Sequence, residues 1–249
     1  MIKIVVCLKM VPGKLIDAER SGLIINPYDL FVLEKLAKLK KNTDISVIGI
    51  CMGGESARER LVRSKALVCD DIYWLNDIKF AQADTIATTK TLSAAIKKYI
   101  PDADAVICGG HAIDGETGQV PAELSEKLGI TYFSSVTDIE SFGHDSAVIV
   151  KKDEGHEMTV RCRYPFLLSV DSFLTYASNL NIIALKRAQK WEYKIISSEE
   201  LGIAQTDCGA AGSKTKVINS VNIIYKKESI EVGGSIKEKA DHVKKLLQQ

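Results

Sequence analysis

Residues 108–120 hold the residue types best suited to binding a ligand and read CGGHAIDGETGQV. A short apolar run precedes them and a helix-like stretch follows, which predicts a loop between a strand and a helix. The glycines of this glycine-rich loop let a ligand approach the backbone, and the free N–H groups of the first helical turn attract an anion. Thr117 is expected to cap the helix and to contact a phosphate. A loop that binds nothing fits the same pattern, so residue types alone leave both interpretations open.

Other signatures of catalysis or cofactor binding are missing from the sequence. It contains no G-x-G-x-x-G after the first strand-like run, no H-E-x-x-H and no G-x-S-x-G, which disfavours a Rossmann site, a zinc protease and a serine hydrolase. Residues 209–215, GAAGSKT, resemble a P-loop only superficially, because Ser213 separates Gly212 from Lys214. The six cysteines form no C-x-x-C pair and the four histidines lie far apart. We therefore expect reduced structural thiols and no metal site.

Composition excludes further classes. Hydrophobic residues make up 46% of the 249 residues and charged residues 26%, which suits a folded domain with a sizeable core. The 33 Lys and Arg balance 32 Asp and Glu, so no nucleic-acid partner is expected, because phosphate-backbone binding requires a basic excess. No apolar stretch approaches the roughly 20 residues of a membrane helix, and the start of the sequence predicts no leader before the first strand-like run. We expect a cytoplasmic protein without membrane insertion.

The elements that must position the glycine-rich loop alternate along the first half of the chain. Strand-like runs occur at residues 2–11, 45–51, 71–75 and 105–108, and helix-like stretches at 26–39, 55–67, 83–100 and 117–128. Continuous apolar strands that alternate with helices predict an α/β fold with a doubly wound, mainly parallel sheet. Ligands of such sheets bind at the carboxyl ends of the strands.

The pattern changes after about residue 131. Short runs at 147–150, 158–162 and 166–170 predict antiparallel strands added at the sheet edge, and residues 181–190 predict a helix. We predict a nucleotide-binding domain at residues 1–204. Residues 205–249 are predicted to hold a Gly/Ala/Ser-rich linker at 205–213, a strand at 217–225 and an amphipathic helix that begins with a capping box of Ser235 and Glu238. This helix is predicted to clasp a partner; the alternative is a helix folded back on its own domain.

Several segments, taken in order, resemble the β subunits of electron-transfer flavoproteins over most of the chain. They are the opening strand with its turn at Lys9, NPYD at 26–29, ICMG at 50–53, AIDGETGQV at 112–120, and residues 176–190. The resemblance implies a fold of the adenine-nucleotide α-hydrolase type without hydrolysis. It also implies a heterodimer with an α subunit that carries FAD.

The resemblance assigns no catalytic residue, since a flavin carries the chemistry. It implies a cofactor site at Cys7, Leu8, Asn26, Pro27, Tyr28, Asp29, Cys51, Asp114, Gly115, Glu116, Thr117, Gly118, Gln119 and Val120. Asn26 is expected to support this site by capping the helix that begins at Pro27. Partner docking is expected at Thr175, Tyr176, Ala177 and Leu180, and in the C-terminal helix at Val243 and Leu247.

The glycine-rich loop also bears on the identity of the nucleotide. AMP-binding members of the family read D-D-x-x-N-Q-T and electron-bifurcating members D-G-D-T-A-Q-V, whereas this chain reads DGETGQV at 114–120. Glycine in place of the second aspartate removes a negative charge near a diphosphate, and two like charges about 4 Å apart near a surface cost on the order of 4 kcal/mol. The resemblance therefore favours FAD over AMP. It implies NADH as electron donor and ferredoxin as a low-potential acceptor.

The chain also departs from the family pattern. Pro121 stands where the family has glycine, and residues 171–176 are shorter than the usual recognition stretch and lack its Asn-Glu-Pro-Arg. The expected electron partner is therefore a dehydrogenase or quinone-linked oxidoreductase other than an ordinary acyl-CoA dehydrogenase. The alternative function is a stand-alone adenine-nucleotide sensor resembling the universal stress proteins. Such a sensor would end near the fifth strand, whereas this chain continues from residue 131 to 249.

Overall fold

The computed structural model describes all residues except 176–179, 217, 220–230 and 248–249. The chain divides into two compact units, Met1–Lys216 and Val217–Gln249. They are called the first and second unit below and are described separately.

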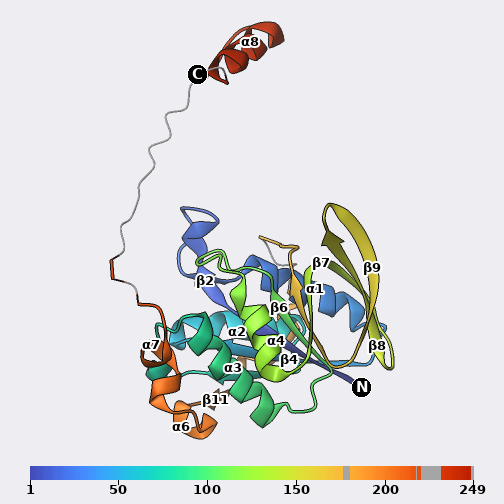
Figure 1. The fold of residues 1–249 in the computed structure, drawn as a ribbon, viewed down its shortest axis with the longest axis vertical. Helices are drawn as coiled ribbons and strands as arrows, with labels where there is room; N and C mark the ends of the chain where they lie inside the picture. The colour runs from blue at the N-terminus through green and yellow to red at the C-terminus, as the bar shows by residue number, and fades with distance from the viewer. Residues whose placement is uncertain (176–179, 217, 220–230, 248–249) are drawn as a thin grey trace. The chain divides into compact units, whose positions relative to one another are not determined.

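A mainly parallel sheet forms the centre of the first unit (Figure 1). In its described residues the strand order is β11-β5-β4-β1-β6-β10-β7-β8-β9. The strands are β1 (Ile2–Leu8), β4 (Ile45–Met52), β5 (Asp71–Leu75), β6 (Ala105–Gly109), β7 (Thr131–Phe142), β8 (Ser146–Asp153), β9 (His156–Arg163), β10 (Phe166–Val170) and β11 (Lys194–Ile196). Every pairing from β11 to β7 is parallel. The predicted α/β fold with a doubly wound sheet is confirmed.

Four helices cover the two faces of this sheet. Side chains of a strand alternate between its faces, so Ile4 and Val6 of β1 join the core beneath α1 (Pro27–Leu39) and α2 (Arg58–Leu67). Val5 joins the opposite core, beneath α3 (Thr85–Tyr99) and α4 (Gln119–Leu128). The apolar stripes of the helices bury against the strands on both sides, which fixes the chain segments at the strand ends.

The prediction for residues 166–170 is wrong in orientation and position. β10 lies inside the sheet and runs parallel to both β6 and β7. All five of its residues are buried, as expected of a strand covered on both faces. The antiparallel edge consists instead of β8, which pairs with the end of β7, and β9, which pairs with β8.

The first strand-like run also differs from the prediction, because it ends at Leu8 and the chain turns at Lys9. Residues beyond this turn form a small antiparallel sheet of β2 (Met10–Pro12) and β3 (Leu23–Ile25). The remaining short elements are η1 (Gly13–Leu15), η2 (Glu55–Ala57), η3 (Ile78–Phe80), α5 (Ile182–Gln189), α6 (Ser198–Leu201), η4 (Gln205–Asp207) and α7 (Gly209–Gly212).

The segment predicted as a linker, residues 205–213, is part of the first unit, which extends beyond the predicted boundary at 204/205. Cys208 is fully buried, and the backbone N of Ala210 donates to the carbonyl of Ala81 at 2.9 Å. A Cβ on Gly209 would lie 2.0 Å from the carbonyl oxygen of Lys79. The small residues of this segment thus permit close packing rather than flexibility. The division between the two units falls at residues 216/217.

Helix α8 (Ile236–Leu246) is the helix of the second unit, among its described residues. It begins with the predicted capping box, in which Ser235 Oγ accepts from the N–H of Glu238 and Glu238 accepts from the N–H of Ser235. Its large apolar side chains, Ile236, Val243, Leu246 and Leu247 at its end, are exposed. Most of the strand predicted at 217–225 lies outside the described residues.

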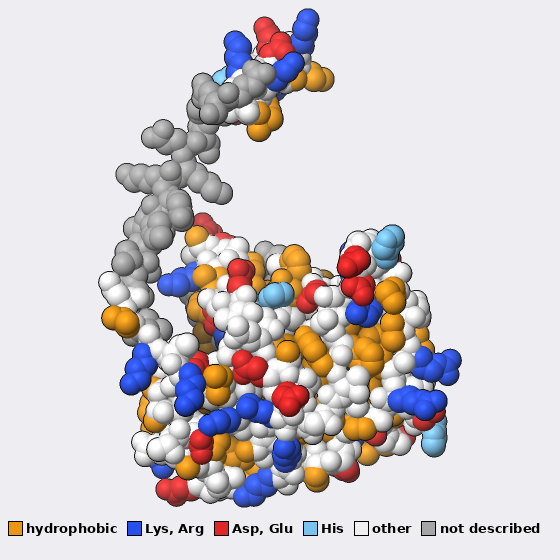
Figure 2. Space-filling view, in the orientation of Figure 1, with side chains coloured by type: hydrophobic (Ala, Val, Ile, Leu, Met, Phe, Trp, Pro, Cys, Tyr) orange, Lys and Arg blue, Asp and Glu red, His pale blue; other side chains and the backbone are white. Residues whose placement is uncertain are grey.

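Two surface properties follow from the described residues. Figure 2 shows acidic and basic side chains interspersed over the visible face of the first unit, without one continuous basic patch. Within the described part of the chain, no helix has both the length and the apolar character that a membrane span requires.

Candidate functional site

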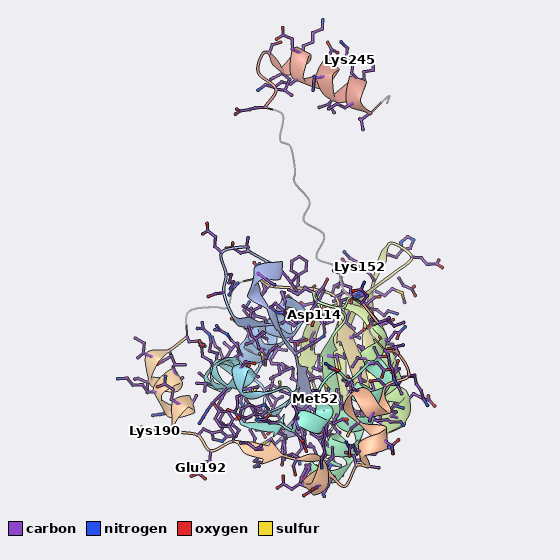
Figure 3. The ribbon with its side chains drawn as sticks, turned by 90° about the vertical axis from the view of Figure 1, so that its left-hand side faces the viewer. Met52, Asp114, Lys152, Lys190, Glu192 and Lys245 are labelled. Carbon is purple, nitrogen blue, oxygen red and sulfur yellow. The ribbon has the colours of Figure 1, made fainter. Side chains whose placement is uncertain are left out.

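The glycine-rich loop lies at the topological switch point of the sheet (Figure 1). From β1 the chain passes to β4 and β5 on one side, whereas β6 pairs with β1 on the other side. Ligands of doubly wound sheets bind outside the carboxyl ends of the strands at such a point. Here those ends are Leu8 of β1 and Gly109 of β6. Figure 3 labels Asp114, which belongs to the loop that follows β6.

Asp29, in the first turn of α1, ties the two strand ends together. Its Oδ2 accepts from the backbone N of Lys9 at 2.8 Å, and its Oδ1 accepts from the backbone N of Gly109 at 3.1 Å. The side chain is buried, and burial raises the pKa of Asp29 to about 7 although these hydrogen bonds and that from Asn26 oppose the rise. The carboxylate of Asp29 therefore links the carboxyl ends of β1 and β6 at the switch point.

Asn26 connects α1 to the glycine-rich loop. Its Nδ2 donates to the carbonyl of His111 at 2.8 Å and to Asp29 Oδ1 at 3.3 Å, while its Oδ1 accepts from the backbone N of Ile113 at 3.4 Å. Asn26 occupies the N-cap position of α1 but makes no side-chain cap bond. The predicted capping role is wrong, because partners in the loop engage both ends of the amide.

Gly109 is required where α1 approaches β6. A Cβ at this position would lie 2.5 Å from Asp29 Oδ1 and 2.7 Å from the Cβ of Tyr28. Asp29 is fixed by its hydrogen bonds and Tyr28 by the helix backbone, so neither has a simple way to retreat. Gly110 is crowded in a similar way, because a Cβ built on it would lie 1.9 Å from the carboxylate of Asp171. Sequence reasoning did not include Asp171 in the site.

Gly109→Ala is expected to destabilise the protein by about 1–3 kcal/mol, the usual cost of overpacking a well-packed site. Urea denaturation measures the effect as a lower midpoint. Gly54→Ala is the matched control, because no atom lies within 4 Å of the added Cβ and open surface positions usually change stability by less than about 0.5 kcal/mol. Equal midpoints for the two variants would contradict the packing role of Gly109.

The glycine-rich loop itself presents exposed residues. Asp114, Gly115, Glu116 and Thr117 are exposed, and Glu116 has φ 49° while Gly118 has φ 62°. Helix α4 begins at Gln119, and its N-cap residue is Gly118, without a side-chain cap bond. Thr117 therefore does not cap the helix, contrary to the prediction. The Thr117 hydroxyl makes no cap bond to the first turn of α4, whose free N–H groups attract anions.

Two further contacts fix the ends of the loop. Lys9 Nζ lies 2.7 Å from Asp114 Oδ1 and so joins the turn after β1 to the loop after β6. Gln119 Oε1 accepts from Thr85 Oγ1 at 3.3 Å, which links the start of α4 to the start of α3. Val120 packs against the core on this side of the sheet. The sequence signal for Lys9 was the turn that the family resemblance places there, after the opening strand.

The remaining cofactor residues predicted from the resemblance lie beneath the switch point. Cys51 and the side chain of Leu8 are buried in the core, and Cys7 is half-buried. Burial raises the pKa of Cys51 to about 12. The hydrogen bond to Cys7, together with burial, raises the pKa of Cys108 well above its ordinary value. The thiols of Cys51 and Cys108 therefore stay neutral near pH 7 and act as small apolar groups.

Part of the predicted docking stretch lies beside the site. The backbone N of Leu174 donates to the carbonyl of Pro27 at 3.0 Å, and the carbonyl of Thr175 accepts from Arg20 at 3.1 Å. The ring of Tyr28 packs near those of His111 and Phe173, at centroid distances of 5.9 and 5.6 Å. Leu180 is half-buried, whereas Tyr176 and Ala177 lie outside the described residues. Val243 and Leu247 belong to the second unit, which is described by itself.

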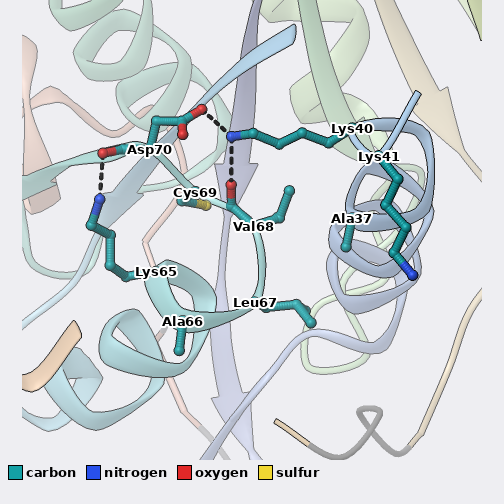
Figure 4. Close-up of a pocket in the computed structure, with 9 residues that line it drawn as sticks. All are labelled: Ala37, Lys40, Lys41, Lys65, Ala66, Leu67, Val68, Cys69 and Asp70. Carbon is teal, nitrogen blue, oxygen red and sulfur yellow. Dashed lines mark hydrogen bonds and ion pairs between the residues drawn. The ribbon is translucent and has the colours of Figure 1, made fainter. Parts of the chain in front are cut away.

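A separate hollow of about 330 Å³ contains none of the predicted site residues (Figure 4). It lies between the end of α1 and the turn from α2 to β5, at the end of the sheet where β4 and β5 begin. Lys40 Nζ donates to the carbonyl of Val68 at 3.3 Å and also pairs with Asp70. This hollow faces away from the carboxyl ends of the strands, so we do not assign the ligand to it.

Comparison with known proteins gives a consistent result. The family described as "Electron transfer flavoprotein domain" matches residues 14–190. A protein of Clostridium acetobutylicum named electron transfer flavoprotein subunit beta is 33% identical, covering 99% of this chain and 98% of the relative. Its namesake in Thermoanaerobacterium thermosaccharolyticum is 32% identical over 92% of this chain and 88% of the relative. The caffeyl-CoA reductase-Etf complex subunit CarD of Acetobacterium woodii is 32% identical over 88% of this chain and 87% of the relative.

Proposed function

Because the chain belongs to the electron transfer flavoprotein family, we propose that it is the β subunit of a heterodimer that carries electrons and holds an adenine nucleotide at the switch point. The observation that carries this proposal is the glycine-rich loop, which Asn26 and Asp29 fasten at the carboxyl ends of β1 and β6. This is the place where doubly wound sheets bind ligands. The stand-alone sensor is disfavoured, since the similarity to β subunits extends over nearly the whole chain.

The residues of the loop fit FAD better than AMP. Space around Gly115 is open, with no atom within 4 Å of a Cβ built there, and this glycine carries no charge to repel a diphosphate. Thr117 and the first turn of α4 would hold phosphate oxygens, while Tyr28 and the loop backbone would orient the rest of the nucleotide. When bound, the flavin would supply the exchange of electrons, and the chain would supply binding and orientation.

The partners follow from the family and from the relatives' names. We propose an α subunit that carries its own FAD and receives the apolar face of α8. One relative is named as a subunit of a caffeyl-CoA reductase complex and another as an acryloyl-CoA reductase electron transfer subunit. These names support a dehydrogenase or reductase as electron partner, docked at the stretch that includes Thr175. NADH as donor and ferredoxin as acceptor complete the bifurcating form of the proposal.

Counting nucleotides tests the proposal. Co-expression of this chain with its α subunit is expected to yield a heterodimer that releases two FAD and no AMP on denaturation, measured by chromatography against protein concentration. One FAD and one AMP per heterodimer would retain the nucleotide site and overturn the choice of FAD. One FAD and no further nucleotide would overturn the site itself.

A further inference from the structure

Lys9 and Asp114 face each other across the switch point. The ammonium group extends from the turn after β1, and the carboxylate from the loop after β6, at a distance of 2.7 Å. Both side chains are reached by solvent, with exposed fractions of 50% and 29%. The pair of Lys9 and Asp114 joins the ends of β1 and β6, and a ligand of this fold binds between these two strand ends.

The backbone of Lys9 is fixed, whereas its side chain is not. Its backbone N donates to the buried carboxylate of Asp29 at 2.8 Å, and its carbonyl accepts from the backbone N of Asn26 at 2.9 Å. The side chain is half-exposed and meets Asp114 at its tip. A lysine so placed keeps its Cα at the carboxyl end of β1 and is free to redirect its ammonium group to another acceptor.

Several acidic groups lie at the strand end and in the loop where the nucleotide would bind. Asp114 and Glu116 lie in the loop, and the carboxylate of Asp171 lies against Gly110. A phosphate entering this surrounding needs a cation, because like charges at close range repel. Lys9 is the side chain placed to provide one, and its pair with Asp114 is partly exposed and therefore weak.

We propose that Lys9 is a phosphate-binding residue and that it exchanges Asp114 for a phosphate oxygen when the nucleotide binds. The proposal rests on the proposed function, since it assumes an adenine nucleotide at the switch point. A phosphate group carries more negative charge than a carboxylate and forms strong charge-assisted hydrogen bonds with lysine. Asp114 then competes with the ligand for Lys9, so the two residues have opposite effects on affinity for phosphate.

Calorimetric titration of the full chain with adenosine, AMP and ADP tests this exchange. The measured quantity is the ratio of AMP affinity to adenosine affinity, which cancels contacts to the base and the ribose. Lys9→Gln is expected to lower this ratio at least tenfold, and Lys9→Arg to restore most of it. Asp114→Asn is expected to raise the ratio severalfold. The exposed Lys14 of η1 supplies the control, since Lys14→Gln should leave the ratio unchanged.

The outcomes separate the exchange from simpler roles. If the ion pair only holds the loop in place, both Lys9→Gln and Asp114→Asn weaken adenosine and AMP equally, and the unchanged ratio overturns the proposal. A ratio that falls in Asp114→Asn also overturns it. If the wild-type chain binds none of the three ligands, the proposed nucleotide site fails and the inference fails with it. Normal AMP binding with an unaffected Lys9→Gln variant overturns the inference alone.

Discussion

Removal of residues 217–249 is expected to abolish stable association with the α subunit while the first unit stays folded. Helix α8 carries Ile236, Val243 and Leu247 in exposed positions, and a helix of this length is marginally stable in water without a surface to pack on. Burying one such side chain is worth about 1.5–3 kcal/mol, and each 1.4 kcal/mol changes the dissociation constant tenfold. The loss of several contacts should therefore weaken binding by more than a hundredfold.

The truncation begins after Lys216 because residues before it belong to the first unit. Asp84 Oδ2 accepts from the backbone N of Lys214 at 2.6 Å and of Thr215 at 3.0 Å. Size-exclusion chromatography of mixed subunits measures association, and thermal denaturation checks that the first unit is folded. Val243→Asp should weaken association, whereas Lys245→Asp, on the opposite side of the helix, is the control for the added acid. Unchanged affinity after truncation would favour a helix that packs on its own chain.

The second large effect concerns Asp29 and pH. The pKa of Asp29 is raised by burial from 3.8 to about 7, so the folded state binds this proton more tightly than the unfolded state. A raised pKa contributes stability that is fully present below pH 3.8 and is lost as pH rises through about 7. Since each pKa unit corresponds to 1.36 kcal/mol, this contribution is on the order of 4 kcal/mol for the fully buried carboxyl group.

Urea denaturation of wild type and of Asp29→Asn between pH 4 and pH 8 measures this contribution. The variant lacks the titrating group, so the stability of wild type relative to the variant should fall as pH rises across this range. Other groups cancel in the difference, including Asp77, where hydrogen bonds from Lys79 and Ser198 lower the pKa and give the opposite dependence. Asp153→Asn, at an exposed position of β8, is the control. Parallel pH profiles for wild type and Asp29→Asn would refute a raised pKa at Asp29.

Local patterns predicted the helices and most strands but not every place in the sheet. The runs at 45–51 and 105–108 are apolar throughout and became interior parallel strands, as such runs predict. Residues 166–170 have the same character, yet short neighbouring strands suggested an edge position. Pairing of β10 with β6 joins residues about sixty positions apart, and a local pattern does not contain such long-range pairings.

The candidate site shows the same division between local and distant determinants. The glycine-rich loop was predicted, because glycines between a strand and a helix are a local signal. The orientation of Asn26 was not, because its partners His111 and Ile113 lie more than eighty residues away. The linker prediction for residues 205–213 failed for a related reason. Small residues occur both in flexible linkers and in closely packed segments, and only contacts with distant residues such as Lys79 and Ala81 distinguish the two.

The two ends of the sheet bear on how the chain behaves without a partner. Unpaired strand edges invite aggregation, and proteins limit this with short edge strands or with charged ones. β11 has three residues, and β9 carries Glu157, Arg161 and Arg163 in exposed positions. Both devices belong to the first unit alone. Protection of this sheet against strand-to-strand aggregation is therefore built into the first unit and does not require a partner.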